Sequence, residues 1–121
     1  MARIYKLAKL ADEQGTYWIT CSFKKDNVLI DAAVISSVVW WLTDLSGNVI
    51  NGREEVSVSS ITNPSIFVFY GDDLQIVDES ASVEGRIFTV RGLFSSSLGV
   101  ALPFTRSVAF DVQNLLVVET V

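Results

Sequence analysis

Carboxylates are the residues of this chain whose type and spacing come nearest to a chemical site. Five of them fall close together: Asp72, Asp73, Asp78, Glu79 and Glu84. Calcium takes about six to eight oxygen ligands that converge on one point. The spacing here matches no EF-hand loop, so we interpret the segment as a solvated acidic loop. We expect Asp72 to accept hydrogen bonds from backbone N–H groups of its own turn instead.

Catalytic chemistry finds little support in the remaining residues. The chain has no histidine, the side chain that most often moves protons near neutral pH, and its only cysteine is Cys21. Without a histidine to activate its thiol, Cys21 is predicted to be a small buried hydrophobe. Neither a Gly-x-Ser-x-Gly elbow nor a glycine-rich phosphate loop occurs. We predict that the protein is not an enzyme and uses no cofactor or metal.

Composition restricts the class of partner. The 121 residues include 14 acidic and 9 basic side chains, a net charge of −5, and half of them are hydrophobic. Nucleic acid is a disfavoured partner, because phosphates need clustered Lys and Arg. The apolar excess in a small domain indicates a surface kept for another protein. A single cysteine excludes an internal disulfide.

The chain also lacks the sequence features of membrane insertion. Its longest apolar run, residues 34–42, is shorter than the roughly 18 residues of a membrane-spanning helix. The N-terminus has no apolar stretch and cleavage site typical of a signal peptide. We therefore expect no membrane partner, and synthesis in the cytoplasm of the producing cell.

Side-chain polarity alternates with a period of two, which is typical of strands with one buried face. Turn residues separate these runs, and the order of the strands fits an immunoglobulin-like Greek-key β-sandwich. The expected strands are 15–23, 34–44, 54–61, 65–70, 86–94 and 104–112, with a loop at 95–103.

The two ends of the chain differ from this pattern. Residues 1–14 fit either a short helix, from Ile4, Leu7, Ala8 and Ala11, or an extended arm or first strand. We treat them as an N-terminal arm and residues 15–121 as one domain that ends in an apolar tail.

Large aromatic residues carry the functional interpretation. The phase of the alternation places Trp40 in the core and Trp41 outside, and Trp18 also faces outward. If residues 66, 68 and 70 face the core, Phe67 and Phe69 face outward as well. The terminal segments then cover these rings, or the rings form a subunit interface, or they stack on sugars. The predicted interface residues are Trp18, Trp41, Phe67, Phe69, Leu115, Leu116, Val118, Arg3, Lys6 and Lys9.

Several motifs together resemble the small immunoglobulin-like virion proteins of tailed bacteriophages. They include Gly-Thr-Tyr-Trp-Ile-Thr at 15–20, Trp-Trp-Leu-Thr-Asp at 40–44 and Gly-Asp-Asp-Leu at 71–74. The further matching stretches are 47–54, 86–90 and 97–103. The likeness covers residues 15–112 and brings no catalytic residues. The cysteine pair of antibody domains is missing.

The resemblance implies a structural protein of a phage particle, most simply a capsid decoration subunit. Its partners would be other virion proteins, such as the major capsid protein or a connector, and copies of itself. A head–tail connector or tail component is the alternative within this class. Outside the class, outward aromatics would suit a carbohydrate-binding or cell-surface adhesion module.

The acidic loop yields a direct test of the absence of a metal role. Excess chelator should leave the melting temperature of the protein unchanged, because the carboxylates from Asp72 to Glu84 show no spacing that closes a coordination shell. The measurement is thermal unfolding followed by circular dichroism, with and without the chelator. A clear drop in the melting temperature would contradict the prediction.

Overall fold

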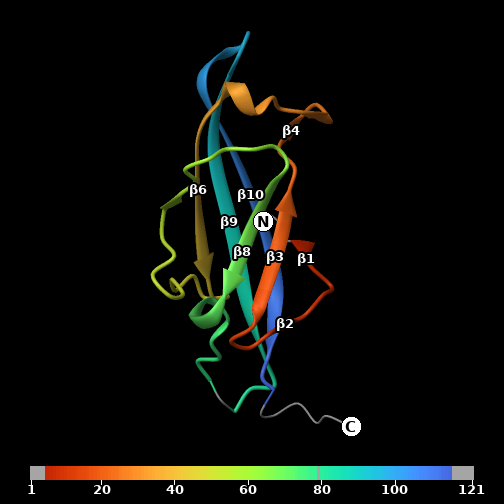
Figure 1. The fold of residues 1–121 in the computed structure, drawn as a ribbon, viewed down its shortest axis with the longest axis vertical. Helices are drawn as coiled ribbons and strands as arrows, with labels where there is room; N and C mark the ends of the chain where they lie inside the picture. Colours follow the sequence, from red (N-terminus) through yellow and green to blue (C-terminus); the bar gives the residue numbers. More distant parts are fainter. Residues whose placement is uncertain (1–4, 79, 116–121) are drawn as a thin grey trace.

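The computed structural model describes residues 5–78 and 80–115, and its regular secondary structure is almost entirely β-strand (Figure 1). The strands are β1 (Tyr5–Lys6), β2 (Ala11–Asp12), β3 (Thr16–Cys21), β4 (Lys24–Lys25), β5 (Val28–Leu29), β6 (Ile35–Thr43), β7 (Val56–Ser57), β8 (Ser65–Tyr70), β9 (Val83–Ser96) and β10 (Gly99–Gln113). Two short 3-10 helices, η1 (Ala32–Val34) and η2 (Gly71–Leu74), precede β6 and follow β8. The all-β prediction is confirmed.

The strands form two layers. One layer is a sheet in the order β1-β10-β9-β6-β7, in which β2 also pairs with β10. The other is the antiparallel pair β3-β8, which lies in front of β9 and β10 in Figure 1. A separate hairpin, β4-β5, turns at Asp26 and Asn27, whose positive φ angles suit this kind of tight turn.

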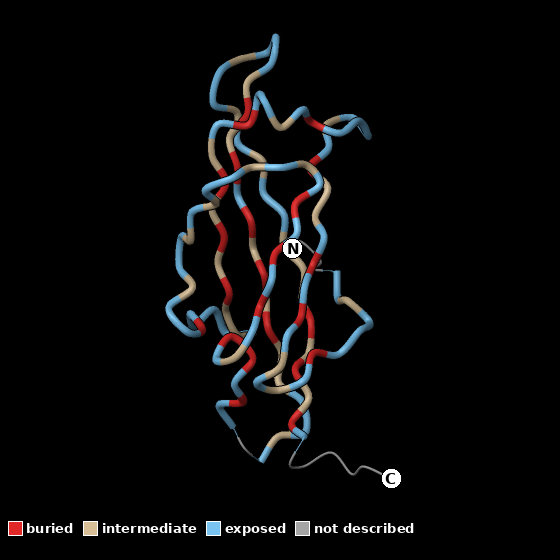
Figure 2. The backbone as a smooth tube through the Cα atoms, viewed as in Figure 1, coloured by how far each residue is buried: buried red, intermediate tan, exposed pale blue. Residues whose placement is uncertain are grey.

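The two layers enclose a core rich in aromatic rings. Buried and half-buried residues alternate along β6 from Val38 to Thr43, with Val38, Trp40 and Leu42 inside as predicted (Figure 2). The ring of Trp40 lies 5.5 Å from Phe69 and 5.9 Å from Phe88, between centroids. Large rings at these separations fill the space between the sheets and also attract one another edge to face.

The predicted phase of β8 is wrong. Phe67 and Phe69 are 5% and 0% exposed, whereas Ile66, Val68 and Tyr70 face outward. Every residue from 66 to 70 is apolar or aromatic, so alternation along this strand alone cannot choose a face. The choice is made by pairing with β3, because residues opposite each other in a sheet share a face.

The register of that pairing explains the burial of the two phenylalanines. Phe69 lies opposite Tyr17, and Phe67 lies opposite Ile19. Both β3 residues are buried, as their alternation predicts. Phe67 and Phe69 therefore belong to the core and cannot act as exposed interface residues in this fold.

The long hairpin of β9 and β10 is another departure from the sequence prediction. Residues 95–103 were expected to form a loop, but the two strands stay paired as far as Ser96 and Gly99. The hairpin projects beyond the rest of the sheet at the top of Figure 1. Pairing across the hairpin, with a register shift between Gly99 and Leu102, holds these residues in place. Near its base, Phe104 occupies the space where a side chain at Gly92 would lie.

The described part of the N-terminal segment forms no helix. Residues 5–14 instead contain β1 and β2, which pair in parallel with β10 through Tyr5 opposite Val108 and Ala11 opposite Val112. Ala11 is buried in the core. The segment therefore forms strands rather than a helix, because its backbone pairs with β10. Farther along, the strand expected over 54–61 is limited to Val56–Ser57.

The burial of Trp40 predicts a large difference between two neighbouring tryptophans. Trp40→Ala should lower the free energy of unfolding by about 3–5 kcal/mol, because it opens a cavity among aromatic rings. Trp41→Ala should cost clearly less, since Trp41 is half-buried on the opposite face of β6. Urea unfolding of both variants is the measurement, and equal losses would contradict the assignment of the two faces.

Candidate interaction surface

Exposed apolar side chains cluster on the solvent-facing side of the β3-β8 pair. Four large side chains occupy it, with exposed fractions of 57% for Trp18, 65% for Ile66, 47% for Val68 and 58% for Tyr70. We call these four residues the outer face. They come from strands that contain no charged side chain. Clusters of exposed apolar residues on one face are uncommon and usually mark interfaces.

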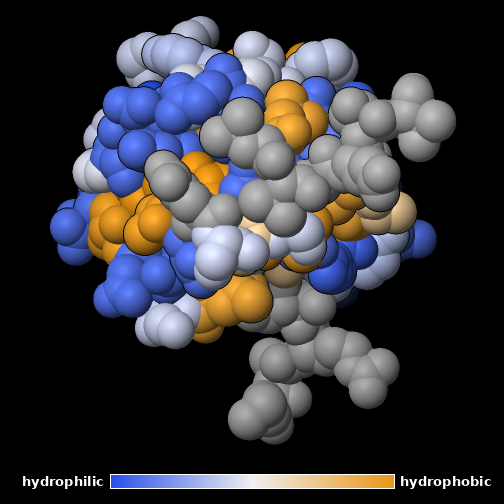
Figure 3. Space-filling view, turned by 90° about the horizontal axis from the view of Figure 1, so that it is seen from below, coloured by the Kyte–Doolittle hydropathy of each residue, from blue (hydrophilic) through white to orange (hydrophobic). Residues whose placement is uncertain are grey.

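The strand register brings these side chains together. Trp18 lies directly opposite Val68, and Tyr70 and Ile66 lie opposite Thr16 and Thr20. Residues opposite each other are close neighbours on a sheet, so the indole ring of Trp18 lies next to Val68. Ile66 and Tyr70 flank Val68 on the same face of β8. Seen from below, the molecule shows several apolar patches separated by hydrophilic residues (Figure 3).

Cations lie at the margins of the outer face. The Lys9 ammonium group is 4.9 Å from the centre of the Trp18 ring, and the Arg53 guanidinium is 5.9 Å from the Tyr70 ring. The Lys9 carbonyl accepts a 2.9 Å hydrogen bond from the hydroxyl of Tyr17. A cation over an aromatic ring is attracted by its negative face, so Lys9 helps to fix the N-terminal segment beside β3.

The structure places the predicted interface residues in different environments. Trp18 faces outward as predicted, whereas Trp41 is half-buried beside Arg91 and Leu93 in a shallow hollow. Leu115 is exposed. Lys6 forms an ion pair with Asp111, within its own sheet. The remaining predicted residues Arg3, Leu116 and Val118 lie outside the described residues.

Sequence reasoning missed Ile66, Val68 and Tyr70 as outer-face residues. The error follows directly from the inverted phase of β8. The signal that could have corrected it is the clear alternation of β3, where Tyr17 and Ile19 are inward and Trp18 is outward. Pairing a strand of known phase with an ambiguous one fixes the second strand, once their register is known.

A buried carboxylate closes the end of β8. Asp73 is fully buried and accepts hydrogen bonds from the Tyr70 backbone N–H at 3.1 Å, Arg53 Nε at 2.7 Å and Asn51 Nδ2 at 3.0 Å. This is the turn-organising role expected of Asp72. The Asp72 side chain instead is exposed and, among the described residues, accepts a single 3.4 Å bond from Gln14.

These contacts shift the acid–base behaviour of the pair. Burial alone would raise the pKa of Asp73, but the bonds from Arg53, Asn51 and the Tyr70 N–H outweigh it and hold that pKa below its usual value. The Asp73 bond in turn raises the pKa of Arg53. The pair remains charged across the physiological range and ties the loop before β7 to the end of β8.

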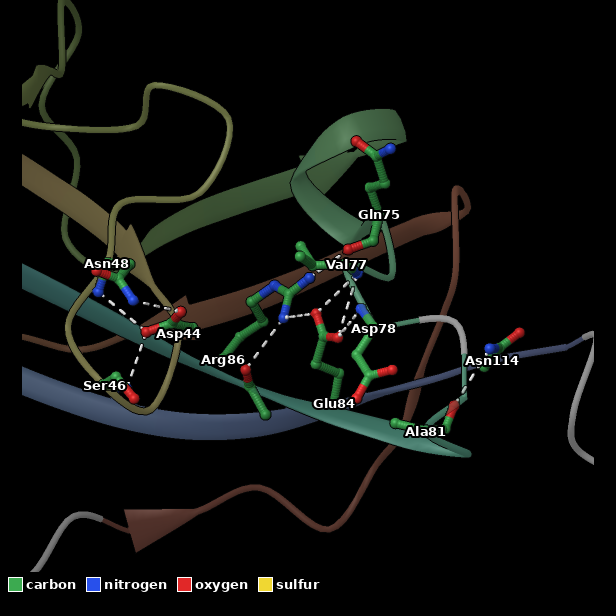
Figure 4. A network of polar contacts seen from close by, with 11 residues as sticks. Asp44, Ser46, Asn48, Gln75, Val77, Asp78, Ala81, Glu84, Arg86 and Asn114 are labelled. Carbon is green, nitrogen blue, oxygen red and sulfur yellow. Dashed lines mark hydrogen bonds and ion pairs between the residues drawn. The ribbon is translucent and has the colours of Figure 1, made fainter.

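A cleft lies next to the polar contacts of Asp44 and Glu84 that Figure 4 shows. Its volume is about 270 Å³, and it is lined by Asp44, Leu45, Ser46, Ile50, Val77, Asp78, Glu84 and Gly85. The carboxylates that line it accept hydrogen bonds from backbone N–H groups. Asp44 accepts bonds from the N–H groups of Ser46 and Asn48, and Glu84 accepts bonds from those of Val77 and Asp78.

A fully buried arginine, Arg86, lies beside this cleft. Arg86 donates to Glu84 Oε1 at 2.8 Å, to the Gly85 carbonyl at 3.1 Å and to the Gln75 carbonyl. Burial would raise the pKa of Glu84, but the Asp78 N–H, the Arg86 guanidinium and the Val77 N–H lower it overall. In residues 5–78 and 80–115, no group of three or more potential ligands could hold a metal ion. The acidic residues described here hold turns together.

Cys21 is half-buried at the end of β3 rather than fully enclosed. Burial raises the pKa of its thiol, and the nearby positive charge of Arg106 lowers it to a lesser degree. The net direction favours the protonated thiol, which is the less nucleophilic form.

Comparisons with known proteins add no relative to this description. No family model, no curated protein and no solved structure matches the chain. Among the described residues, no helix has the length and apolar character needed to cross a membrane.

The Asp73 network predicts a pH-dependent loss of stability. Asp73→Asn should lower the free energy of unfolding by about 2–3 kcal/mol at pH 7, because it removes a charged partner of Arg53. The folded pKa lies below that of an unfolded Asp, about 3.9, so the contribution of the charge is present above that pH. It is lost as the pH falls through the folded pKa.

Urea unfolding at pH 7 and near pH 3 should therefore show a gap between wild type and variant that narrows in acid. Asp72→Asn is the matched control and should change stability little at either pH, since Asp72 is exposed. Equal effects of the two substitutions at pH 7 would contradict the role given to Asp73.

Proposed function

We propose that this protein is a non-enzymatic structural protein that acts by docking its outer face on another protein surface. The observation that carries the proposal is the exposure of Trp18, Ile66, Val68 and Tyr70 on one face without a charged residue on either strand. Tryptophan and tyrosine are enriched among the residues that dominate binding energy at interfaces. A neutral apolar surface needs little desolvation of charge when a partner covers it.

We further propose that the fold is an immunoglobulin-like Greek-key sandwich. The support is the strand order β10-β9-β6-β7 in one layer with β3-β8 in the other, together with the parallel pairing of β1 and β2 to β10. In this arrangement Trp40 occupies the central core position on β6. The fold by itself selects no function.

The particle in which such a protein would act is proposed from the sequence resemblance to virion proteins of tailed bacteriophages. We propose a capsid decoration subunit located in the virion, bound to the major capsid protein. The net charge of −5 suits the outside of a shell better than contact with packaged DNA. A head–tail connector or tail component would use the same outer face against a different neighbour.

A carbohydrate-binding module is the second candidate, and one observation favours it. Trp18 and Tyr70 are both exposed on the same face of the β3-β8 pair, and flat aromatic rings can stack on sugars. Titration with oligosaccharides separates the two proposals. A saturable sugar-dependent change in tryptophan fluorescence that is lost in Trp18→Ala would favour the second candidate.

The docking proposal predicts that Trp18→Ser weakens binding to particles by about tenfold or more, since a central interface aromatic contributes about 2 kcal/mol. The measurement is co-sedimentation with phage particles that were assembled without this chain. The fold of the variant is checked by its urea unfolding curve.

Leu98→Ser is the matched control, because Leu98 is an exposed apolar residue at the tip of the β9-β10 hairpin, away from the outer face. It should leave binding unchanged. If Leu98→Ser weakens binding as much as Trp18→Ser, or if neither variant does so, docking through the outer face is wrong.

A further inference from the structure

We infer that the free edge of β8 pairs with the same edge of a second copy of this chain, so that two β3-β8 pairs join into one four-stranded antiparallel sheet. The inference deepens the proposed docking function and rests on it, because the joined sheet would present two outer faces side by side. It is carried by the direction of the β8 backbone groups and by the absence of charge along the strand.

One hydrogen bond sets the direction of those backbone groups. The Gly71 N–H donates to the Gly15 carbonyl at 3.1 Å, and these residues lie opposite each other when the β3-β8 register is extended by one step. In an antiparallel pair, hydrogen-bonded and non-hydrogen-bonded positions alternate. Phe69 and Phe67 therefore direct their N–H and C=O groups to β3, whereas Val68 and Ile66 direct theirs to the free edge.

Tyr70 belongs to the second set, and its N–H is already used. It points away from β3, as the alternation requires, and donates to Asp73 Oδ2 at 3.1 Å. Strand β8 pairs with β3 alone, and within residues 5–78 and 80–115 the N–H groups of Ile66 and Val68 have no protein partner. The open ladder is therefore short and centred on Phe67.

The edge at β7 and the other edge of the β3-β8 pair are better protected. Natural edge strands avoid pairing by being short, carrying charges or lying under another segment. Strand β7 is two residues long and follows Glu54 and Glu55. The other edge of β3 faces the segment that contains Lys9, which contacts both Tyr17 and Trp18. Strand β8 has no charged residue, proline or register shift between Ser65 and Tyr70.

A second copy satisfies this edge because the open ladder is self-complementary. With a two-fold axis at Phe67, Ile66 of each copy lies opposite Val68 of the other, and each such pair exchanges two N–H···O=C bonds. Although each chain carries a charge of −5, no like charges oppose each other along the paired strands. Ile66 and Val68 of both copies would also contact one another on the outer side.

Amide hydrogen exchange of the wild-type protein tests the pairing directly. At low concentration the amides of Phe67 and Phe69 should exchange slowly and those of Ile66 and Val68 quickly. Raising the protein concentration about a hundredfold should slow Ile66 and Val68 several-fold, because dimerisation covers them by mass action. Analytical ultracentrifugation over the same range should show a monomer–dimer equilibrium.

Val68→Pro is the matching substitution, since proline removes only an N–H that faces the open edge and edge positions of this kind tolerate it. It should weaken dimerisation by about tenfold or more, through the loss of two hydrogen bonds per dimer. Val68→Lys, which protects an edge by charge, serves as the second variant if the proline variant does not fold. Thr20→Lys is the control, because it adds the same charge to the outward side of β3 while leaving the β8 edge intact.

A wild-type protein that stays monomeric at millimolar concentration would overturn the inference, and so would unchanged dimerisation of a folded Val68→Pro or Val68→Lys. Dimers that are lost in Trp18→Ser but kept in Val68→Pro would show packing of the outer faces instead of edge pairing, and would also overturn it. These outcomes are read on the isolated protein. Loss of particle binding by a protein that still dimerises would count against the proposed function alone.

Discussion

The packing of aromatic rings between the two layers is the constraint on which the rest of the structure depends. Trp40, Phe69 and Phe88 approach one another from β6, β8 and β9, with centroid separations between 5.3 and 5.9 Å. Because these large rings fill the core, the other apolar residues of β8 must face solvent. The same packing that stabilises the fold therefore creates the outer face.

The buried charged residues of this protein hold separate segments of the chain together. Asp73 binds Arg53 and the Tyr70 N–H, and Glu84 binds Arg86 and the N–H groups of the loop before it. Each buried charge has a partner, as the cost of desolvating a charge demands. Two carboxylates of the acidic stretch, Asp73 and Glu84, hold neighbouring segments together in this way. The neutral β3-β8 pair remains as the surface open to a partner.

The predicted exposure is confirmed for Trp18 and wrong for Phe67 and Phe69, for a clear physical reason. Trp18 was identified from β3, where polar and apolar residues alternate, and its exposure is as predicted. Phe67 and Phe69 were placed outside because β8 is apolar on both sides, so either phase satisfied its sequence. The extent of the β9-β10 hairpin was also missed, because pairing across it holds residues with little strand preference of their own.

The sequence by itself determined the all-β class, the positions of the long strands, and the inward phase of Tyr17, Trp40 and Leu42, since these follow from local alternation and turn residues. Only the tertiary structure decided which face of β8 enters the core and that Asp73, rather than Asp72, is buried. It also decided that the N-terminal segment pairs with β10. Each of these depends on contacts between residues far apart in the chain, and no local pattern encodes which partner a strand or carboxylate will meet.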